Sequence, residues 1–457
     1  MTIMNLAIPQ EVTSLAQKFT AGGYEFYLAG GAVRDFIMGK DIYDWDFTTD
    51  AMPEQILAIL GEDAFYDNRF GTVGYPHKED ERPFEITTFR TETTYSDARH
   101  PDEIKWGKSL EEDLTRRDFT INAMAIKISS IEYQVSNDLE IIDPFGGQKD
   151  LEQKIIRAVG DPVERFSEDA LRMMRAVRIA AELGFTIEEE TFDAIKTHVV
   201  SIHKIARERV RDELFKIIGS KYPYEGVVLL HGSGLMDEIL PELSKTFGVE
   251  QKSPGRHHIH DVGTHSLMTL KNCPSQDVIT RFAALIHDIG KPQTFKVKEG
   301  IITFYNHEVV GARIAKNIAT RLRFSHKDKD KLYKLVRWHQ FTVDERQTDK
   351  AIRRFITKVG LEYVEDMLAL RVGDRLGGGA TETSWRLEEY KKRLIEVQKQ
   401  PFTVRDLKID GSDVMKELNI KPGPKVGEIL NKLFEDVVEK RVENEREALL
   451  KKLQEFK

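Results

Sequence analysis

The chain has 457 residues, of which 40% are hydrophobic and 32% are charged, and its formal net charge at pH 7 is −8. This length exceeds what one hydrophobic core supports and indicates three or four domains, and the high charged fraction with few prolines predicts a mostly helical globular protein. The negative net charge excludes a uniformly basic nucleic-acid-binding protein, so a bound RNA would need basic residues gathered on one face.

The cysteine content and the N-terminus indicate the compartment. Cys273 is the only cysteine, which excludes internal disulfides and zinc–thiolate sites and fits a reducing cytosol. The first residues, MTIMNLAIPQEV, lack the basic start and apolar core of a signal peptide, and no apolar run of about 18 residues occurs. We therefore expect a soluble cytoplasmic protein that does not bind a membrane.

The segment Tyr27–Thr49, YLAGGAVRDFIMGKDIYDWDFTT, has the pattern of a strand, a helix and a second strand. Gly30 and Gly31 end the first apolar run, where they let a ligand approach the backbone, and the helix after them would present free N–H groups to a phosphate. Asp44 and Asp46 are two residues apart, so on a strand both carboxylates would point to the same face and share a cation such as Mg²⁺. A phosphate cradle beside a metal-holding aspartate pair predicts a phosphoryl-transfer site.

This combination, GGAVRD followed by DWD, resembles the head-domain signature of the nucleotidyltransferases that include the CCA-adding enzymes of transfer RNA and the bacterial poly(A) polymerases. The resemblance implies that Asp44 and Asp46 are catalytic and hold Mg²⁺, and that Gly30, Gly31 and Arg34 bind the nucleotide.

Further elements complete the predicted head. Ile8–Phe19 and Pro53–Leu60 are expected to be helices, and Phe84–Thr88 alternates as a strand does. Glu85 on that strand is either a third metal ligand or a charge on the strand face, and the sequence leaves both readings open.

Residues 90–117 are polar, rich in turn formers and long, and a loop of this size is uncommon unless it is functional. The segment resembles the flexible loop of CCA-adding enzymes, which relatives adding only the two cytidines lack. This resemblance favours addition of the terminal adenosine as well.

Residues 116–126, RRDFTINAMAI, combine Arg116, Arg117 and Asp118 with an apolar run that reads as helical. Taken alone, they fit a helix whose N-cap is Asp118 and whose arginines lie in solvent. The segment also resembles the second motif of the family, which implies that Arg116 or Arg117 contacts the triphosphate and Asn122 a ribose hydroxyl.

Residues 165–185, RFSEDALRMMRAVRIAAELGF, predict one helix that begins at Ser167 and carries Glu168 and Asp169 in its first turn. Its apolar stripe is formed by Leu171, Met174, Val177 and Ala181. Before it, the string DPFGG within residues 141–159 marks a hinge between the head and a helical neck, and it also occurs in the family.

Four polar residues recur every third position on this predicted helix: Asp169, Arg172, Arg175 and Arg178. They form either a solvated ridge of weak ion pairs or a base-reading surface. A carboxylate acceptor beside a guanidinium donor complements the edges of cytosine and adenine but not those of guanine and uracil, so it could select C and A without a template. The run is similar to the EDxxR amino-acid template of bacterial CCA-adding enzymes, which implies that Asp169 and Arg172 read the base and that Arg175 and Arg178 contact the nucleotide.

Residues 196–221 carry an excess of basic side chains, which suits either an RNA backbone or a solvated helix. Near the C-terminus, Pro422–Pro424 form a turn between two predicted helices. This turn is either a nucleic-acid-binding hairpin or a packing hairpin, and both readings stay open.

Residues 246–380 contain histidines and aspartates at helical positions: His265, His287, Asp288, His307, His339 and Asp374. This set resembles the HD-type metal phosphohydrolases, in which His265, the His287–Asp288 pair and Asp374 would hold one divalent ion. His307 and His339 match the positions that bind a second ion. Imidazole and carboxylate ligands without a thiolate suit Mn²⁺, Ni²⁺, Fe²⁺ or Mg²⁺ more than structural zinc. Hydrolysis follows less directly, because a metal site can persist while its pocket changes.

We therefore predict an α+β protein. It would have a small mixed α/β head of the nucleotidyltransferase (polymerase-β-like) type at residues 1–148, a base-selecting and RNA-binding helical neck at 149–245, an HD-type domain at 246–380 and a helical, tRNA-binding tail at 381–457.

The predicted reaction is template-independent addition of C, C and A to the 3′ end of tRNA from CTP and ATP, with release of pyrophosphate and with phosphoesterase activity in the HD-type domain as a second expectation. The alternatives are a poly(A) polymerase, an enzyme that adds only part of the CCA end, and an HD phosphohydrolase with a non-catalytic RNA-binding head. The sequence does not predict the oligomeric state.

Overall fold

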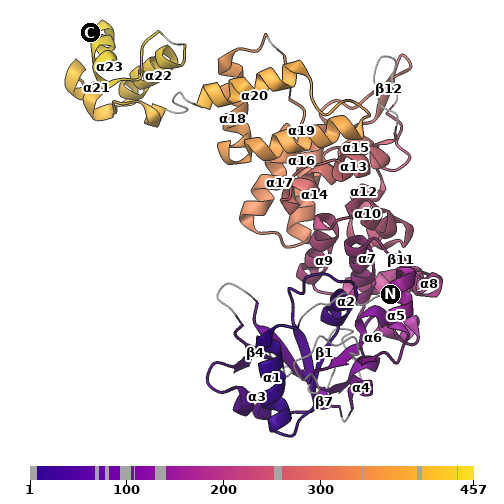
Figure 1. Cartoon of the computed structure of the whole chain (residues 1–457). Helices are drawn as coiled ribbons and strands as arrows, with labels where there is room; N and C mark the ends of the chain where they lie inside the picture. Colours follow the sequence, from indigo (N-terminus) through magenta and orange to yellow (C-terminus); the bar gives the residue numbers. More distant parts are fainter. Residues whose placement is uncertain are drawn as a thin grey trace. The chain divides into compact units, whose positions relative to one another are not determined.

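The computed structural model describes residues 8–66, 72–77, 82–92, 104–107, 109–128, 140–251, 260–341, 343–344, 346–398, 404–439 and 441–456. The chain divides into two compact units: Met1–Ser244 with Arg321–Arg323, and Lys245–Thr320 with Phe324–Lys457. Figure 1 follows the chain through both units. Among the described helices, none is both long and apolar enough to cross a bilayer.

The first unit begins with a mixed sheet whose strand order is β3-β4-β5-β2-β1-β8-β9. In that order the strands span Phe65–Tyr66, Thr72–Tyr75, Phe84–Thr88, Asp46–Thr49, Phe26–Ala29, Ala125–Lys127 and Ile141–Ile142. Neighbouring strands are antiparallel except β2 and β5, which run parallel with Asp46 opposite Glu85. This register sets two carboxylates side by side on inner strands of the sheet.

Three helices of the head lie where the sequence predicts helices. They are α1 (Gln10–Ala21), α2 (Gly31–Ile37) and α3 (Pro53–Leu60). Helix α1 buries residues at helical spacing, and its Phe19 ring stacks 4.5 Å from that of Phe26 on β1, whose ring in turn lies 4.8 Å from that of Phe47 on β2. This aromatic stack fixes β2, and with it the position of Asp46.

Parts of residues 90–117, which the sequence predicts to be a long loop, are regular structure. The described residues form the hairpin of β6 (Arg90–Glu92) and β7 (Ile104–Trp106), and α4 (Leu110–Thr115). Residues 93–103 and 108 lie outside the described part of the chain. The apolar run after Asp118 is also not the predicted helix: it forms the short 3₁₀ helix η1 (Thr120–Asn122) and then strand β8, because its residues complete the sheet beside β1.

The neck is helical apart from the short parallel strands β10 (Ile155–Ile156) and β11 (Thr186–Ile187). Its helices are α5 (Gly147–Gln153), α6 (Pro162–Glu168), α7 (Leu171–Leu183), α8 (Glu189–His198), η2 (Val199–Lys204), α9 (Arg207–Gly219), α10 (Pro223–Gly232), α11 (Leu235–Ile239) and α12 (Pro241–Ser244). Helix α7 packs between α9 and α10 and buries the predicted stripe of Leu171, Met174, Val177 and Ala181.

The prediction of one helix over residues 165–185 is wrong at Asp169. This residue has extended backbone angles (φ −138°, ψ 105°) and separates α6 from α7. Ser167 lies inside α6, whose N-cap is Asp161. The helix breaks because the Asp169 carboxylate accepts the Leu171 backbone N–H at 2.9 Å and therefore caps the start of α7.

The second unit contains a helical bundle with one exposed hairpin, β12 (Lys296–Lys298) and β13 (Ile301–Thr303). The helices are α13 (Val262–Lys271), α14 (Val278–Ile286), α15 (Lys291–Thr294), α16 (His307–Arg321), α17 (His326–Trp338), α18 (Asp349–Val359), η3 (Leu361–Tyr363), α19 (Val364–Gly377) and α20 (Trp385–Gln398). Helix α14 contacts α13, α17 and α19 and is buried almost all round, which makes it the centre of the bundle.

The C-terminal residues have a hydrophobic core of their own. This core joins η4 (Val404–Asp406), α21 (Gly411–Leu418), α22 (Pro424–Val438) and α23 (Arg446–Leu453), followed by η5 (Gln454–Phe456). Helix α20, which the predicted boundary at residue 381 assigns to the tail, instead buries Tyr390, Leu394 and Val397 with residues of α18. The packing therefore groups α20 with the bundle.

Candidate functional site

A cavity of about 380 Å³ in the first unit joins head and neck residues. Its polar lining comprises Gly30, Gly31, Asp46, Thr72, Glu85, Thr87, Arg90, Arg116, Arg117, Asp118, Asn122, Asp169, Arg172, Arg175 and Arg209. Asp46 and Glu85 lie on strands β2 and β5, Arg116 and Arg117 follow α4 (Leu110–Thr115), Arg172 and Arg175 lie on α7, and Arg209 lies on α9. The structure thus brings the candidate metal ligand Asp46 into the same cavity as the candidate base readers Asp169 and Arg172.

Gly30 lies where only glycine fits. Its φ of +74° disfavours any residue with a Cβ, and a Cβ built there would lie 2.6 Å from Nη1 of Arg117 and 3.7 Å from Oδ2 of Asp46. The backbone at Gly30 therefore lies close to both a guanidinium and a carboxylate, in the lining of the cavity.

Asp46 begins strand β2, and its carboxylate is held in a poorly solvated position. Burial, opposed by Arg117 and reinforced by the charge of Glu85, raises the pKa of Asp46 to about 6. A carboxylate disfavoured by burial and by a neighbouring carboxylate fits a divalent cation, which would offset both effects.

Asp44 does not lie on the strand, contrary to the prediction. It precedes β2 on an exposed bend and forms an ion pair with Arg82. Its carboxylate would repel those of Asp46 and Glu85, so the nearby arginine is the better partner as long as no cation lies between them.

Arg116 and Arg117 are oriented by one buried carboxylate that the sequence analysis overlooked. The fully buried Asp113 on α4 accepts hydrogen bonds from Nη2 of Arg116 at 2.7 Å and Nη2 of Arg117 at 3.1 Å. Burial opposes ionisation of Asp113, but the two arginines outweigh it and keep its pKa below the ordinary value. The arginine side chains are only about 20% exposed, so the alternative prediction that they lie in solvent is wrong.

Asp118, in the cavity lining, and Arg34, outside it, each orient another side chain of the lining. Asp118 accepts a hydrogen bond from Nε of Arg175 at 2.7 Å, and although burial opposes its ionisation, this arginine lowers the pKa of Asp118 to about 2. Arg34 is absent from the cavity lining, and its Nη1 donates to Oδ1 of Asn122 at 2.9 Å. Asp118 therefore positions Arg175, and Arg34 orients Asn122.

Asp169 and Arg172 are held by different partners rather than by each other. Oδ2 of Asp169 lies 3.3 Å from Nη2 of Arg209 on α9. Arg172 is 8% exposed, and its guanidinium donates to the carbonyls of Arg165 at 3.3 Å and Arg116 at 3.0 Å. Its guanidinium is therefore a fixed donor at the cavity wall.

Arg178 does not share this position. Its guanidinium pairs with Glu182 at 3.2 Å and with the buried Glu213 at 2.7 Å, and it is absent from the lining of the cavity. Because α7 advances about 100° per residue, Arg178, six residues after Arg172, lies roughly 120° round the helix from it and does not face the cavity.

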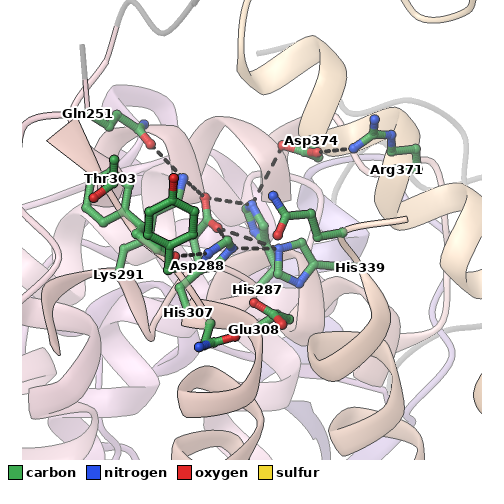
Figure 2. A pocket seen from close by; sticks show the side chains of 14 residues that line it. Gln251, His287, Asp288, Lys291, Thr303, His307, Glu308, His339, Arg371 and Asp374 are labelled. Carbon is green, nitrogen blue, oxygen red and sulfur yellow. Dashed lines mark hydrogen bonds and ion pairs between the residues drawn. The ribbon is translucent and has the colours of Figure 1, made fainter. Parts of the chain in front are cut away.

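The second unit gathers the six predicted histidine and aspartate side chains in one cluster, in which all but the partly exposed Asp374 are buried. Figure 2 shows five of them, His287, Asp288, His307, His339 and Asp374, around the cavity. Around Oδ2 of Asp288, Nε2 of His287 lies at 3.1 Å and Nε2 of His265 at 3.7 Å, while Oδ1 of Asp374 lies 3.1 Å from the same His265 nitrogen. The second oxygen of Asp288, Oδ1, faces Nε2 of His307 at 3.3 Å and Nε2 of His339 at 3.6 Å. Asp288 thus presents one oxygen to each of two ligand groups.

Backbone carbonyls set the tautomers of three of these histidines. Nδ1 of His287, His307 and His339 lies 2.9, 2.9 and 2.7 Å from the carbonyl oxygens of Ala284, Phe304 and Val336. A carbonyl only accepts, so each Nδ1 carries the proton and each Nε2 of a neutral ring presents a lone pair. Nε2 of His307 and Nε2 of His339 are 3.3 Å apart, and such facing lone pairs fit a metal ion that binds both.

Comparisons with known proteins agree with this geometry. The family model for the poly A polymerase head domain matches residues 26–157, the model described as the probable RNA and SrmB-binding site of polymerase A matches residues 184–247, and the model described as tRNA nucleotidyltransferase domain 2, putative, matches residues 303–453. The CCA-adding enzyme of Ligilactobacillus salivarius (strain UCC118) is 34% identical over 446 residues, which cover 97% of this chain and 96% of that protein. The chain belongs to the CCA-adding enzyme family.

Two further relatives show the breadth of this family. The A-adding tRNA nucleotidyltransferase of Deinococcus radiodurans is 33% identical over 431 residues, which cover 89% of this chain and 90% of that protein. The crystal structure of the Bacillus stearothermophilus CCA-adding enzyme in complex with CTP matches with a TM-score of 0.73 and 29% identity, over 98% of this chain and 97% of that one. Nucleotidyltransferases of this family use divalent metal ions.

For this member of the CCA-adding enzyme family, the sequence predicted the motif residues but not several of the residues that hold their side chains in place. Two of these are Asp113 on α4 and Arg209 on α9. For Asp113 the sequence contained one signal, the string EEDLTRR, which puts it three and four residues before two arginines. Arg209 was visible only as one of many basic residues in the neck.

Proposed function

We propose that this chain adds nucleotides from CTP and ATP to the 3′ end of tRNA, building the CCA sequence and releasing pyrophosphate. The observation that carries the proposal is the shared cavity of Asp46, Asp169 and Arg172. It is supported by relatives named CCA-adding enzyme that span nearly the whole chain. Such a substrate also agrees with the predicted cytoplasmic location.

Asp44 and Asp46 are the proposed Mg²⁺ ligands, and the exposed Asp44 would exchange Arg82 for the cation. Magnesium there would lower the pKa of the RNA's terminal 3′-hydroxyl and stabilise the charge of the triphosphate. Arg116 and Arg117, fixed by Asp113, would bind triphosphate oxygens, since planar guanidinium groups pair well with phosphate. Glu85 faces the same cavity and is a candidate third carboxylate.

Around the nucleotide, Gly30 and Gly31 would admit the triphosphate to the backbone, and Asn122, oriented by Arg34, would contact the ribose. The Asp169 carboxylate would accept a hydrogen bond from the exocyclic amine of cytosine or adenine, and the Arg172 guanidinium would donate one to the adjacent ring nitrogen. Arg209 holds Asp169, and Arg175 lines the same wall.

The domains proposed from sequence are kept, with one change. The head is assigned to residues 1–148 and the neck to 149–245. The HD-type domain would run from 246 to 398, because α20 packs on α18, and the tail would begin after it. The head and neck together would carry the nucleotidyl-transfer site.

The decisive experiment offers tRNA that ends before CCA with each labelled nucleotide in turn and in combination. We expect incorporation of C, C and then A, followed by a stop. A ladder of adenosines would identify a poly(A) polymerase, and addition of A only to tRNA ending in CC would identify an A-adding enzyme like the Deinococcus relative. No incorporation at all would leave the head as an RNA-binding module.

A second candidate function is metal-dependent hydrolysis of phosphate esters in the second unit. The cluster of six candidate ligands, five of them buried, favours it, because carboxylates and imidazoles that face one another without thiolates suit Mn²⁺, Ni²⁺, Fe²⁺ or Mg²⁺. Ions bound there would polarise a phosphoryl group and lower the pKa of a water molecule. By the resemblance to HD-type enzymes, the substrates would include 2′,3′-cyclic phosphates at RNA ends.

Asp288→Asn is expected to abolish stoichiometric metal binding in the second unit, because Asp288 offers an oxygen to each ligand group. Metal content is measured by elemental analysis after loading with Mn²⁺ and dialysis. Asp330→Asn, on the exposed side of α17, is the matched control and should bind as much metal as the wild type. A wild-type protein that retains no ion, or an Asp288→Asn variant that retains all of it, would contradict the proposal.

A further inference from the structure

Lys291 is a buried cation in the wall of the cavity that contains the histidine–aspartate cluster (Figure 2). This cavity has a volume of about 510 Å³, and Lys291 is only 7% exposed. Its Nζ lies 2.6 Å from Oδ2 of Asp288 and 2.7 Å from Oε1 of Gln251. The burial of this ammonium requires an explanation, because Lys is almost never fully buried without partners.

The Lys291 ammonium has one donor to spare. It carries three N–H groups, and its oxygen partners among the described residues are Asp288 and Gln251. The nearby ring of Phe304, 5.4 Å from Nζ to the centroid, closes another side without offering an oxygen. The third N–H therefore lacks a protein oxygen in the described part of the chain, at a residue that lines the cavity.

Gln251 fixes this ammonium without neutralising it. The amide is 2% exposed, and its Nε2 donates to the carbonyls of His260 at 3.2 Å and Asp261 at 3.3 Å. Because both carbonyls only accept, the amide nitrogen must face them and Oε1 must face Lys291. A glutamate here would cancel the lysine charge, whereas glutamine leaves it available to a ligand.

A role as counter-ion of Asp288 alone does not explain Lys291 once the cluster holds a divalent ion. The same Asp288 oxygen lies among the ligands of His265 and His287, so a cation bound there would already neutralise it. The buried ammonium would then face a positive centre, which is unfavourable unless an anion lies between them. Arg371 repeats this arrangement, since it lines the cavity and its Nη1 donates to Oδ2 of the other carboxylate, Asp374, at 3.1 Å.

We propose that Lys291 binds a phosphoryl oxygen of the ligand in this cavity and that Gln251 is the positioning residue that holds its ammonium. The ligand class is a phosphate ester, or the orthophosphate released from a monoester, with an oxygen left for the lysine beyond those facing the ions. This inference rests on the proposed metal-dependent phosphoesterase function.

The experiment measures metal content and the affinity for inorganic phosphate on the full-length chain loaded with Mn²⁺, by elemental analysis and calorimetry. Lys291→Met is expected to keep the metal and to raise the Kd for phosphate about 10- to 100-fold, the effect of losing one charge-assisted hydrogen bond. Lys291→Arg should recover part of the affinity. Lys296→Met, an exposed lysine on β12, is the matched control and should bind phosphate as the wild type does.

The outcomes separate this inference from the function on which it rests. A wild-type protein that retains no metal refutes the phosphoesterase proposal itself. A metal-loaded wild type that does not bind phosphate, or a Lys291→Met variant that keeps the wild-type affinity or loses the metal, overturns only the role of Lys291. If Lys291→Met does not fold, Gln251→Leu decides: it should keep the metal and weaken phosphate binding, and an unchanged affinity would overturn the inference.

Discussion

Replacing Asp46 by asparagine is expected to lower nucleotide incorporation into tRNA by roughly 1,000-fold, because metal ions contribute several kcal/mol to the stabilisation of such transition states. Asparagine keeps the size of the side chain but removes the negative charge that would bind the cation between Asp46, Asp44 and Glu85. The measurement is the single-turnover rate of labelled CTP incorporation at saturating magnesium. The metal content of the second unit should stay unchanged.

The same substitution should not destabilise the fold. The pKa of Asp46 is raised by burial to about 6, so the folded protein binds the proton more tightly than the unfolded chain does. The ionised carboxylate therefore lowers the free energy of unfolding above pH 6, and this penalty disappears as the pH falls below the ordinary value of 3.8. At pH 7 without metal, the Tm of Asp46→Asn should equal or exceed that of the wild type.

The exposed Asp63→Asn is the matched control and should leave incorporation unchanged. An Asp46→Asn variant that still incorporates CTP within a few-fold of the wild type would remove Asp46 from the catalytic role. A variant with a much lower Tm would instead show that its loss of activity comes from unfolding.

Local sequence patterns predicted the helices and strands of the head well, because the patterns and these elements both depend on residues close together in the sequence. The strand before Gly30, the helices α1 and α3 and the strand β5 follow from periodicity and turn residues. The histidines of the second unit were also predictable as a set, because the HD pair ends a strongly apolar helix and the tautomers come from carbonyls three residues earlier.

The errors arise where a distant partner overrides the local pattern. Residues 165–185 contain no glycine or proline before Gly184, so nothing local predicts a break at Asp169. The break suits a carboxylate that caps α7 and also reaches Arg209, which is 40 residues away in the sequence. Asp44 leaves the predicted strand for Arg82, 38 residues away. Such pairings depend on the tertiary fold and carry no periodic signal.

Asp169→Ala is expected to remove most of the selection for C and A. Removing a hydrogen bond to a charged group costs about 1.5–3 kcal/mol, so kcat/KM for CTP and for ATP should fall roughly 10- to 150-fold while the values for UTP and GTP change little. The selectivity ratio should therefore drop by the same factor. Arg172→Lys should act in the same direction, because a lysine cannot reproduce the planar donor pair held by the carbonyls of Arg165 and Arg116.

Arg178→Lys separates base reading from a general effect of changing α7. The family resemblance implies that Arg178 contacts the nucleotide, whereas its guanidinium pairs with Glu182 and Glu213 away from the cavity lining. We expect Arg178→Lys, which keeps the charge, to retain the wild-type selectivity ratio. Two results would contradict base selection by Asp169 and Arg172, the pair proposed to face the base in this cavity. One is an Arg178→Lys variant that shifts the ratio as far as Asp169→Ala does, and the other is an Asp169→Ala variant that leaves the ratio intact.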